Sequence, residues 1–464
     1  MKNQTTSAQA ENPLGTAPVG SLIAKFAIPA IISMLVSALY NIVDRIYIGQ
    51  MPVVGRDALT GLGLTFPILM IISAFAALAG MGGAPLCSIY RGQGDDKQAE
   101  DIMGNSLSLL LIFGVALTML GLVFKGPALY LFGASDITFP YADNYLTIYL
   151  SGSIFVMIGL GMNYFISAQG FAKESMFTVL IGAALNIALD PVFIFALDMG
   201  VQGAALATVL SQMVSAVWCM GFLLSKRSLL KLRWKSLRLR WGFVKRICAL
   251  GFSSFTMQVT ESAVQIVSNA SLQIYGGDIY VGVMTVVNSI KQVLMMPLQG
   301  FAQGAQPVIG FNYGAKKYGR VTEGCKSLML MCIAYSVFSW ALALLFPGAL
   351  IRVFNSDPSL LSVGIPAMRI YFLSQCLMGL QMAAQNSFVA LNKPKEAMFF
   401  ALLRKGILLI PLMLIMPKLF GLGAMGIFVA EPIADAVSAI SCFTTFMLTA
   451  WRSLKKSSTV SLQP

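Results

Sequence analysis

Long apolar stretches constrain this chain more than any other feature of its sequence. Runs of about 20 or more apolar residues recur along the whole chain, long enough to cross a bilayer core of roughly 30 Å. Only 11% of the residues are charged, and the mean hydropathy of +0.77 lies far outside the range of soluble domains. Because the alternating ten-residue segments of a transmembrane barrel are absent, the sequence predicts an all-α polytopic membrane protein.

The apolar windows between polar breaks predict twelve transmembrane helices. An even number of spans places both termini on the same side of the membrane. The helices are expected to start near residues 22, 58, 102, 143, 175, 201, 243, 279, 322, 363, 396 and 421.

Basic residues predict which side that is. They crowd the connection between the sixth and seventh helices and recur in loops of the same parity, whereas the opposite loops hold few. By the positive-inside rule, both termini and the long middle loop are expected in the cytoplasm. This topology signal accounts for most of the +13 net charge, so no nucleic-acid partner is expected. The connection holds Lys226, Arg227, Lys231, Arg233, Lys235, Arg238, Arg240, Lys245 and Arg246.

The two halves of the chain resemble each other. GAPLCSIYRGQ (83–93) matches AQPVIGFNYGA (305–315), and AKESMF (172–177) matches PKEAMF (394–399), with one common offset of 222 residues. Six helices per repeat give two halves of the same orientation, and transporters built this way bind substrate between halves that rock. A duplicated channel or enzyme is the alternative interpretation.

This repeat predicts five segments along the chain. The polar N-terminus lacks the basic region and cleavage site of a signal peptide, so the first helix is expected to act as an uncleaved insertion signal. The segments are a disordered cytoplasmic tail (1–20), a first six-helix lobe (21–225), a basic cytoplasmic linker (226–242), a second six-helix lobe (243–452) and a cytoplasmic tail (453–464).

Four oxygen-bearing side chains are predicted to form a layer in the outer half of the first lobe. A carboxylate in mid-membrane is costly, which makes a retained one a functional hypothesis. At a rise of 1.5 Å per residue, Asp44, Asp190 and Thr208 lie roughly 8–12 Å from the outer helix ends, with Asn186 one turn deeper than Asp190. Hard cations such as Na⁺ prefer oxygen ligands, and two carboxylates close together in a low dielectric can share a proton.

The second repeat lacks this layer. With the 222-residue offset, Asp44, Asn186 and Asp190 fall on Ile266, Leu408 and Leu412, so the fold itself does not require the polar set. The structural alternative is that these are snorkelling or capping groups, with Arg45 as the simplest partner of Asp44. Pro191 removes a backbone hydrogen bond and is expected to bend the helix beside Asp190.

The second lobe holds three further intramembrane acids. Glu431 and Asp435 lie one turn apart, opposite Thr208 and Gln212 in the repeat, while Glu261 and Lys291 fall near mid-depth. A static Glu261–Lys291 or Glu431–Lys291 pair and an acidic substrate cavity are both open interpretations. The tentative cavity set is Glu261, Lys291, Glu431, Asp435 and Gln212.

Cysteine and histidine usage narrows the chemistry. The seven cysteines are scattered through apolar segments without a C-x-x-C pair, which favours small core residues over disulfides or metal ligands. With no histidine in the chain, proton-linked chemistry falls to carboxylates. No phosphate-binding G-x-x-x-x-G-K-[ST] motif occurs, so no nucleotide or other cofactor is expected besides a coupling H⁺ or Na⁺.

Several motifs, in order, resemble the MATE family of multidrug and toxic compound extrusion transporters, closest to its bacterial MepA-like branch. They are NIVDRIYIGQ (41–50), LGLTFP (62–67), NIALDPVFIF (186–195), QGAALATVLSQ (202–212) and GFAQGAQPVIGFNYGA (300–315). The resemblance covers about residues 20–450. It implies a V-shaped pair of six-helix bundles that exports lipophilic, often cationic drugs in exchange for inward H⁺ or Na⁺, and a cation site at Asp44, Asn186, Asp190 and Thr208.

The NorM-type branch of the family implies a second-lobe site that this chain does not reproduce. Its helix-seven Glu corresponds to Glu261, but the tenth predicted helix contains no acid. From the composition, the topology signal and the family resemblance together, we expect a multi-pass protein of a bacterial inner membrane. We expect it to be a monomer surrounded by lipid that acts as a drug antiporter and not as an enzyme. The alternatives are a flippase for a lipid-linked saccharide and a membrane-embedded transferase.

Overall fold

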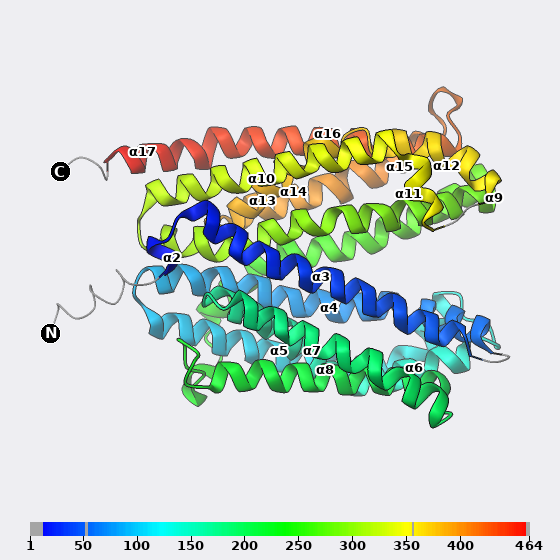
Figure 1. The fold of residues 1–464 in the computed structure, drawn as a ribbon, viewed down its shortest axis with the longest axis horizontal. Coiled ribbons are helices and arrows are strands. Elements are labelled where there is room, and N and C mark those ends of the chain that lie inside the picture. The colour runs from blue at the N-terminus through cyan, green and yellow to red at the C-terminus, as the bar shows by residue number, and fades with distance from the viewer. Residues whose placement is uncertain (1–12, 52–53, 355–356, 461–464) are drawn as a thin grey trace. The chain divides into compact units, whose positions relative to one another are not determined.

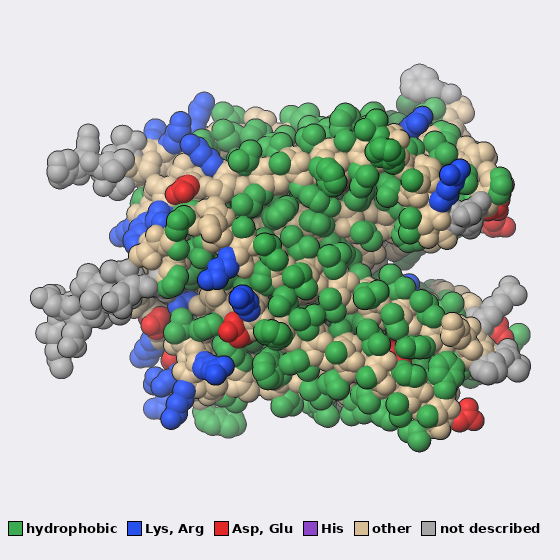
Figure 2. All heavy atoms as spheres, in the orientation of Figure 1, with side chains coloured by type: hydrophobic (Ala, Val, Ile, Leu, Met, Phe, Trp, Pro, Cys, Tyr) green, Lys and Arg blue, Asp and Glu red, His purple; other side chains and the backbone are tan. Residues whose placement is uncertain are grey.

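The computed structural model describes residues 13–51, 54–354 and 357–460 (Figure 1). Within these ranges all regular structure is helical and no strand occurs. This follows from the sequence, because a helix satisfies its own backbone hydrogen bonds and an open sheet edge in lipid cannot. Lys and Arg gather mainly at one end of the helices, and hydrophobic side chains cover their middle part (Figure 2).

The chain divides into two compact units. The N-unit comprises Ile32–Arg91 and Asp95–Phe255, and the C-unit comprises Met1–Ile31, Gly92–Gly94 and Thr256–Pro464. The long helices α3 and α9 each begin in one unit and continue in the other. These units differ at their edges from the lobes expected at 21–225 and 243–452, which stay a prediction.

The N-unit is a bundle of long helices. In it α5 and α8 each pack against α6, and α7 packs against α8. Its elements are α3 (Val19–Gly49, from Ile32 on), α4 (Gly55–Gly92), α5 (Asp96–Leu131), α6 (Phe139–Ala168), α7 (Ala172–Pro191), the π-helix η1 (Val192–Ala196), α8 (Gly200–Leu224), the 3₁₀ turn η2 (Trp234–Leu237) and the start of α9 (Trp241–Gly314).

The C-unit repeats this plan with more interruptions. Here α13 packs against both α10 and α16. Its elements are α2 (Pro13–Thr16), the start of α3, the rest of α9, α10 (Tyr318–Leu345), α11 (Pro347–Arg352), α12 (Pro358–Tyr371), α13 (Gln375–Ala390), α14 (Pro394–Leu402), the π-helix η3 (Leu403–Leu409), α15 (Ile410–Ile415), the 3₁₀ turn η4 (Leu419–Gly421), α16 (Ala424–Phe446), the π-helix η5 (Met447–Trp451) and α17 (Arg452–Val460).

The prediction of twelve spans is confirmed. Among the described residues, ten helices are long and apolar enough to cross a membrane, and the bent pair α12 and α13 makes an eleventh span. The twelfth comes from the 74-residue α9, which Gly277 breaks in two. Gly277 has φ +70°, a conformation that glycine adopts without the penalty a Cβ would bring. The helices begin within about six residues of the starts predicted from the sequence.

The tail predicted to be disordered over residues 1–20 contains helical structure in its described part, residues 13–20. Residues 1–12 lie outside the described part, but Pro13–Thr16 forms a helical turn and α3 begins at Val19. Its backbone carbonyls are held by side chains of the C-unit: Asn312 Nδ2 donates to Leu14 O at 2.8 Å, and Arg320 donates to Ala17 O at 2.6 Å. A polar composition did not reveal these partners, which lie about 300 residues away in the chain.

Glycines allow the helices of the N-unit to approach closely. A Cβ at Gly251 on α9 would lie 1.8 Å from the carbonyl oxygen of Leu78 on α4, and one at Gly82 would lie 2.2 Å from that of Ile247. The two helices therefore pack backbone to backbone, as small residues permit in membrane proteins.

We predict that Gly251→Ala lowers the free energy of unfolding by about 1–3 kcal/mol, because the added methyl forces the two backbones apart. Denaturant or thermal unfolding in detergent measures this change. Gly221→Ala is the matched control, since nothing lies within 4 Å of a Cβ there. That control is expected to be neutral or to gain up to about 1 kcal/mol of helix propensity. Equal stability of the two variants would contradict the packing account.

Candidate functional site

Three of the four residues predicted for the first-lobe layer form a hydrogen-bonded group. The amide of Asn186 donates to Asp190 Oδ1 at 3.3 Å and to Thr208 Oγ1 at 3.3 Å. Asn186 and Asp190 lie one turn apart on α7, and Thr208 comes from the adjacent α8. Asp190 is fully buried, with 0% of its surface exposed.

The fourth residue, Asp44 on α3, is also buried and belongs to the same neighbourhood. Its carboxyl lies close enough to interact electrostatically with Asp190 and with the hydroxyl of Tyr145. Arg45, the simplest partner suggested by the sequence, forms no ion pair with it among the described residues. The Arg45 guanidinium instead lies 5.8 Å from the centre of the Phe66 ring. Arg45 still interacts electrostatically with Asp44 as its neighbour in the chain, so the sequence alternative holds as a charge interaction without an ion pair.

This group, which we call the carboxylate cluster (Asp44, Asn186, Asp190 and Thr208), contains oxygens with no donor. Asp44 Oδ1, Asn186 Oδ1 and Asp190 Oδ2 are all buried and find no hydrogen-bond partner within the described part of the chain. Such orphans are rare in folded proteins, and each calls for an explanation such as a bound ion. No Lys or Arg pairs with either carboxylate in the described ranges. The geometry thus leaves two acids and an amide oxygen available to a proton or a small hard cation.

The backbone after Asp190 departs from α-helical geometry, as Pro191 led us to expect. α7 ends at Pro191 and continues directly as the π-helix η1, where Leu197 N donates to Val192 O at 2.9 Å. Proline cannot donate to the carbonyl one turn before it. Short π-helical stretches often accompany functional sites, and this one begins two residues from the Asp190 carboxylate.

Tyrosines that the sequence did not single out surround the carboxylate cluster. Tyr145 and Tyr149 on α6 are buried, with ring centres 6.1 Å apart, and Tyr145 lies beside the Thr208 side chain. Tyr40 on α3 lies beside Gln212 on α8. Tyr40 and Asp44 lie one helical turn apart, and this spacing predicts that both side chains share one face of α3. The α6 tyrosines come from a different helix and left no local signal.

The intramembrane charges of the C-unit are arranged differently, as a network of ion pairs. Lys291 on α9 pairs with Glu431 and lies 3.6 Å from Asp435, both on α16. Arg404 Nε on η3 lies 2.8 Å from Asp435 Oδ1. Lys405 Nζ, on the next residue, lies 2.8 Å from Glu261 Oε2. Three carboxylates thus meet three cations, and we call these six residues the ionic network.

The ionic network decides between the sequence alternatives for the second lobe. The Glu431–Lys291 pair is present, whereas Glu261 pairs with Lys405, which we did not single out, and not with Lys291. Each acid has a basic partner, which favours the paired interpretation over an acidic cavity wall. Lys291 lies 4.7 Å from the Tyr371 ring centre, and the Tyr371 hydroxyl donates to Asn288 Oδ1 at 2.9 Å. Glu261 is the accessible member, with 64% of its side chain exposed.

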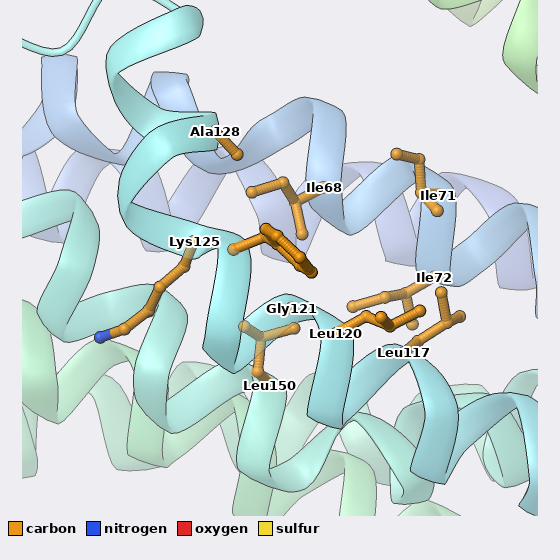
Figure 3. Close-up of a pocket in the computed structure, with 10 residues that line it drawn as sticks. Ile68, Ile71, Ile72, Leu117, Leu120, Gly121, Lys125, Ala128 and Leu150 are labelled. Carbon is orange, nitrogen blue, oxygen red and sulfur yellow. The ribbon is translucent and has the colours of Figure 1, made fainter.

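An apolar hollow of about 260 Å³ lies elsewhere in the N-unit (Figure 3). It opens between α4 and α5 and contains no residue of the carboxylate cluster. Its one charged neighbour, Lys125, points away from the apolar side chains and pairs with Asp143 at 2.6 Å. The hollow is lined by Ile68, Ile71, Ile72, Leu117, Leu120, Gly121, Phe124, Lys125, Ala128 and Leu150.

Twelve helical spans in two repeats, with charges buried at membrane depth, define a membrane transporter built by internal duplication. The family model described as MatE matches the chain twice, over residues 29–192 and 254–415. The chain therefore belongs to the MATE family. The two matches start about 225 residues apart, close to the 222-residue offset of the sequence motifs.

Relatives of this chain include named exporters. The multidrug export protein MepA of Staphylococcus haemolyticus is 24% identical over 439 residues, which cover 94% of this chain and 96% of that protein. The Staphylococcus aureus MepA is 24% identical, over 91% of this chain and 92% of that protein.

Solved structures of MATE transporters are also similar. A MATE multidrug transporter, DinF-BH, solved in complex with a ligand, is 38% identical, with a TM-score of 0.86 over 94% of this chain and 98% of that one. An outward-facing multidrug resistance MATE transporter of the MOP superfamily has a TM-score of 0.88 at 25% identity, over 96% of this chain and 98% of that one.

We predict that Lys291→Met lowers the free energy of unfolding by about 3–5 kcal/mol, because it removes the cation that pairs with the buried Glu431 and lies beside the buried Asp435. Thermal unfolding in detergent measures this loss. Lys326→Met, at an exposed position on α10, is the control and is expected to change stability by less than about 0.5 kcal/mol. Adding Glu431→Gln to Lys291→Met restores the charge balance and should recover part of the loss. An unchanged melting temperature for Lys291→Met would contradict the network.

Proposed function

We propose that this chain is a secondary antiporter that exports lipophilic, often cationic compounds in exchange for inward H⁺ or Na⁺. The observation that carries the proposal is the carboxylate cluster, with three buried oxygens that have no partner in the described structure. Two carboxylates held without a cation in a low dielectric are costly, and binding a proton or Na⁺ removes that cost. The cluster therefore has a physical reason to take up a cation.

The four cluster residues take distinct parts in this proposal. A proton would be shared between the Asp44 and Asp190 carboxylates, with the Asn186 amide keeping Asp190 in position through its 3.3 Å hydrogen bond. Na⁺ would instead use both carboxylates together with the Asn186 carbonyl and Thr208 hydroxyl oxygens, a set of hard ligands. In either case the cation enters from the outside, disfavours bound drug and lets the two lobes rock back.

The driving force is sufficient for such an exchange. A tenfold proton gradient supplies roughly 1.4 kcal/mol per H⁺. A membrane potential of 100 mV adds about 2.3 kcal/mol per charge. One inward H⁺ can therefore support a gradient of several hundredfold for an uncharged drug. A singly charged cationic drug needs a second inward cation to benefit from the membrane potential.

The names of the relatives support drugs as substrates, since MepA is a multidrug export protein and DinF-BH is a multidrug transporter solved with a bound ligand. In this chain we assign substrate contact to Gln212 beside the carboxylate cluster and to Glu261, the exposed member of the ionic network. Glu431 and Asp435 are buried and both contact Lys291, which is partly buried, so in this proposal these three residues hold the C-unit together and set the charge that a substrate meets.

A flippase for a lipid-linked saccharide is the second candidate. Such a carrier needs basic residues free to bind phosphate, and the C-unit does hold the buried Arg404 and Lys405 and the partly buried Lys291. Each of these has a carboxylate partner within 4 Å, so the network offers no net positive charge to a phosphate. This balance favours drug export.

We place the protein in the cytoplasmic membrane of a bacterium, as a monomer with both termini in the cytoplasm. The Staphylococcus relatives support a bacterial source. In the C-unit, α2 and α17 lie at the same end of the bundle (Figure 1), which supports termini on one side. The basic linker supports the cytoplasmic side.

We predict that Asp190→Asn abolishes gradient-driven efflux while the protein still folds and inserts, because an amide can neither take up a proton nor offer a negative charge to Na⁺. The measurement is ethidium or norfloxacin transport in proteoliposomes, with pH and Na⁺ gradients imposed separately. The matched control is Asp198→Asn, at an exposed loop position with φ +50° that asparagine tolerates. This control should transport like the parent.

The two gradients separate the coupling ions. Transport that follows only the pH gradient assigns H⁺, and transport that follows only the Na⁺ gradient assigns Na⁺. Full transport by Asp190→Asn would remove the cluster from the coupling mechanism. Efflux that responds to neither gradient would argue against an antiporter.

A further inference from the structure

The basic linker between α8 and α9 is a folded segment docked on the N-unit (Figure 1). Polar side chains on α5 bind its backbone. Glu100 Oε1 accepts a hydrogen bond from Lys231 N at 2.9 Å, Asn105 Oδ1 accepts one from Arg240 N at 2.8 Å, and Ser108 Oγ donates to Leu237 O at 2.6 Å. These contacts fix which side of the linker points outward.

The close fit of the linker on α5 also needs a glycine. A Cβ at Gly104 would lie 2.4 Å from Ser236 O, so a larger residue there would lift the linker from the helix. Gln169, at the end of α6, adds a further contact, because its side-chain oxygen accepts from Leu230 N at 3.0 Å. A loop whose only role was to set the membrane topology through its positive charge would not need these specific docking contacts.

The outward side of the docked linker presents two tryptophans. Trp234 is 90% exposed and Trp241 is 78% exposed. Indole rings with an apolar body and a polar N–H concentrate where a membrane meets water. Trp241 is the first residue of α9, a helix that enters the membrane, and Trp234 begins the 3₁₀ turn η2 of the linker. Exposure of both indoles to bulk water would leave a large apolar area uncovered next to the membrane.

Uncompensated positive charge surrounds these tryptophans. Of the basic residues on the linker, Arg233 and Arg240 pair with Glu100 and Asp101. The remaining ones are exposed and form no ion pair with any described carboxylate: Lys226, Arg227, Lys231, Lys235 and Arg238. Polybasic segments next to a membrane attract anionic lipids, and each charge adds to the attraction.

We propose that this face, the linker platform (residues 226–241), binds the headgroup phosphates of anionic phospholipids in the adjacent leaflet, with Trp234 and Trp241 inserted at the interface. Charge complementarity selects the anionic headgroup, and the two indoles select a lipid surface over a soluble anion. The docking contacts to Glu100, Asn105 and Ser108 hold the platform in one orientation, so the lipid meets a preformed site.

The test uses the full chain in nanodiscs that contain phosphatidylcholine and phosphatidylglycerol, with bromine quenchers on one lipid at a time. The tryptophan signal of the platform is the difference between the parent and the Trp234→Phe/Trp241→Phe variant. Brominated phosphatidylglycerol is expected to quench this signal at least about twofold more than brominated phosphatidylcholine at equal mole fraction, because the platform enriches the anionic lipid around itself.

Two variants with four substitutions each separate local from general electrostatics. Lys226→Gln/Arg227→Gln/Lys235→Gln/Arg238→Gln removes platform charges that make no docking contact, and it should abolish the preference for phosphatidylglycerol. Lys173→Gln/Lys316→Gln/Lys326→Gln/Lys395→Gln removes the same charge from exposed positions elsewhere and should keep the preference. Equal quenching by both lipids in the parent, no quenching by either, or a preference that survives in the first variant would each overturn the proposal.

A third variant tests whether the linker must be docked on α5. Gly104→Ala keeps every charge and both tryptophans but displaces Ser236, so it should make the linker more sensitive to proteolysis and weaken the preference for phosphatidylglycerol. An undiminished preference in this variant, together with increased proteolysis of the linker, would show that orientation is not needed and would overturn the preformed site. Unchanged proteolysis of the linker would contradict the claim that Gly104 is needed to dock the linker on α5.

Discussion

The burial of carboxylates inside the membrane is the constraint on which the rest of this structure depends. A charged acid transferred out of water needs a partner, and the two units meet that need in different ways. In the C-unit, Glu261, Glu431 and Asp435 find Lys405, Lys291 and Arg404. In the N-unit, Asp44 and Asp190 form no ion pair within the described ranges. Their polar neighbours are an amide, a threonine hydroxyl and tyrosines, with the Arg45 charge beside Asp44. The N-unit is therefore the half in which a bound H⁺ or Na⁺ can neutralise unpaired carboxylates.

The internal repeat shows how one helical plan came to carry both arrangements. With the 222-residue offset, Arg404 and Lys405 correspond to Gly182 and Ala183, so the first repeat lacks the cations of the second. Conversely, Asn186 and Asp190 correspond to Leu408 and Leu412, so the second lacks the cluster of the first. Both repeats interrupt this helix with a π-helical turn: η1 begins two residues after Asp190, and η3 contains Arg404 and Lys405. The duplicated fold thus supports a balanced unit and an unbalanced one.

The sequence predicted the elements of this structure better than their contacts. Apolar length alone located the spans, because a helix must be long enough to cross the bilayer. Depth arithmetic along single helices placed Asn186, Asp190 and Thr208 together, since the rise per residue is fixed. The partner of Glu261 was out of reach, because Lys405 lies on a π-helix whose facing direction differs from that of an α-helix. The position of Tyr145 beside the carboxylate cluster depends on packing between distant segments, which no local pattern encodes. The same holds for the hydrogen bond from Arg320 to Ala17 O.

The central claim is that the carboxylate cluster exchanges its cation when a drug binds. Release of that cation by the purified protein in weakly buffered detergent tests it directly, with a pH indicator for H⁺ and a Na⁺ electrode for Na⁺. The account predicts that adding ethidium to the parent protein releases one of these ions in proportion to the drug bound. Asp44→Asn/Asp190→Asn should bind ethidium with no release. Equal ion release from the parent and from this double variant would contradict the account.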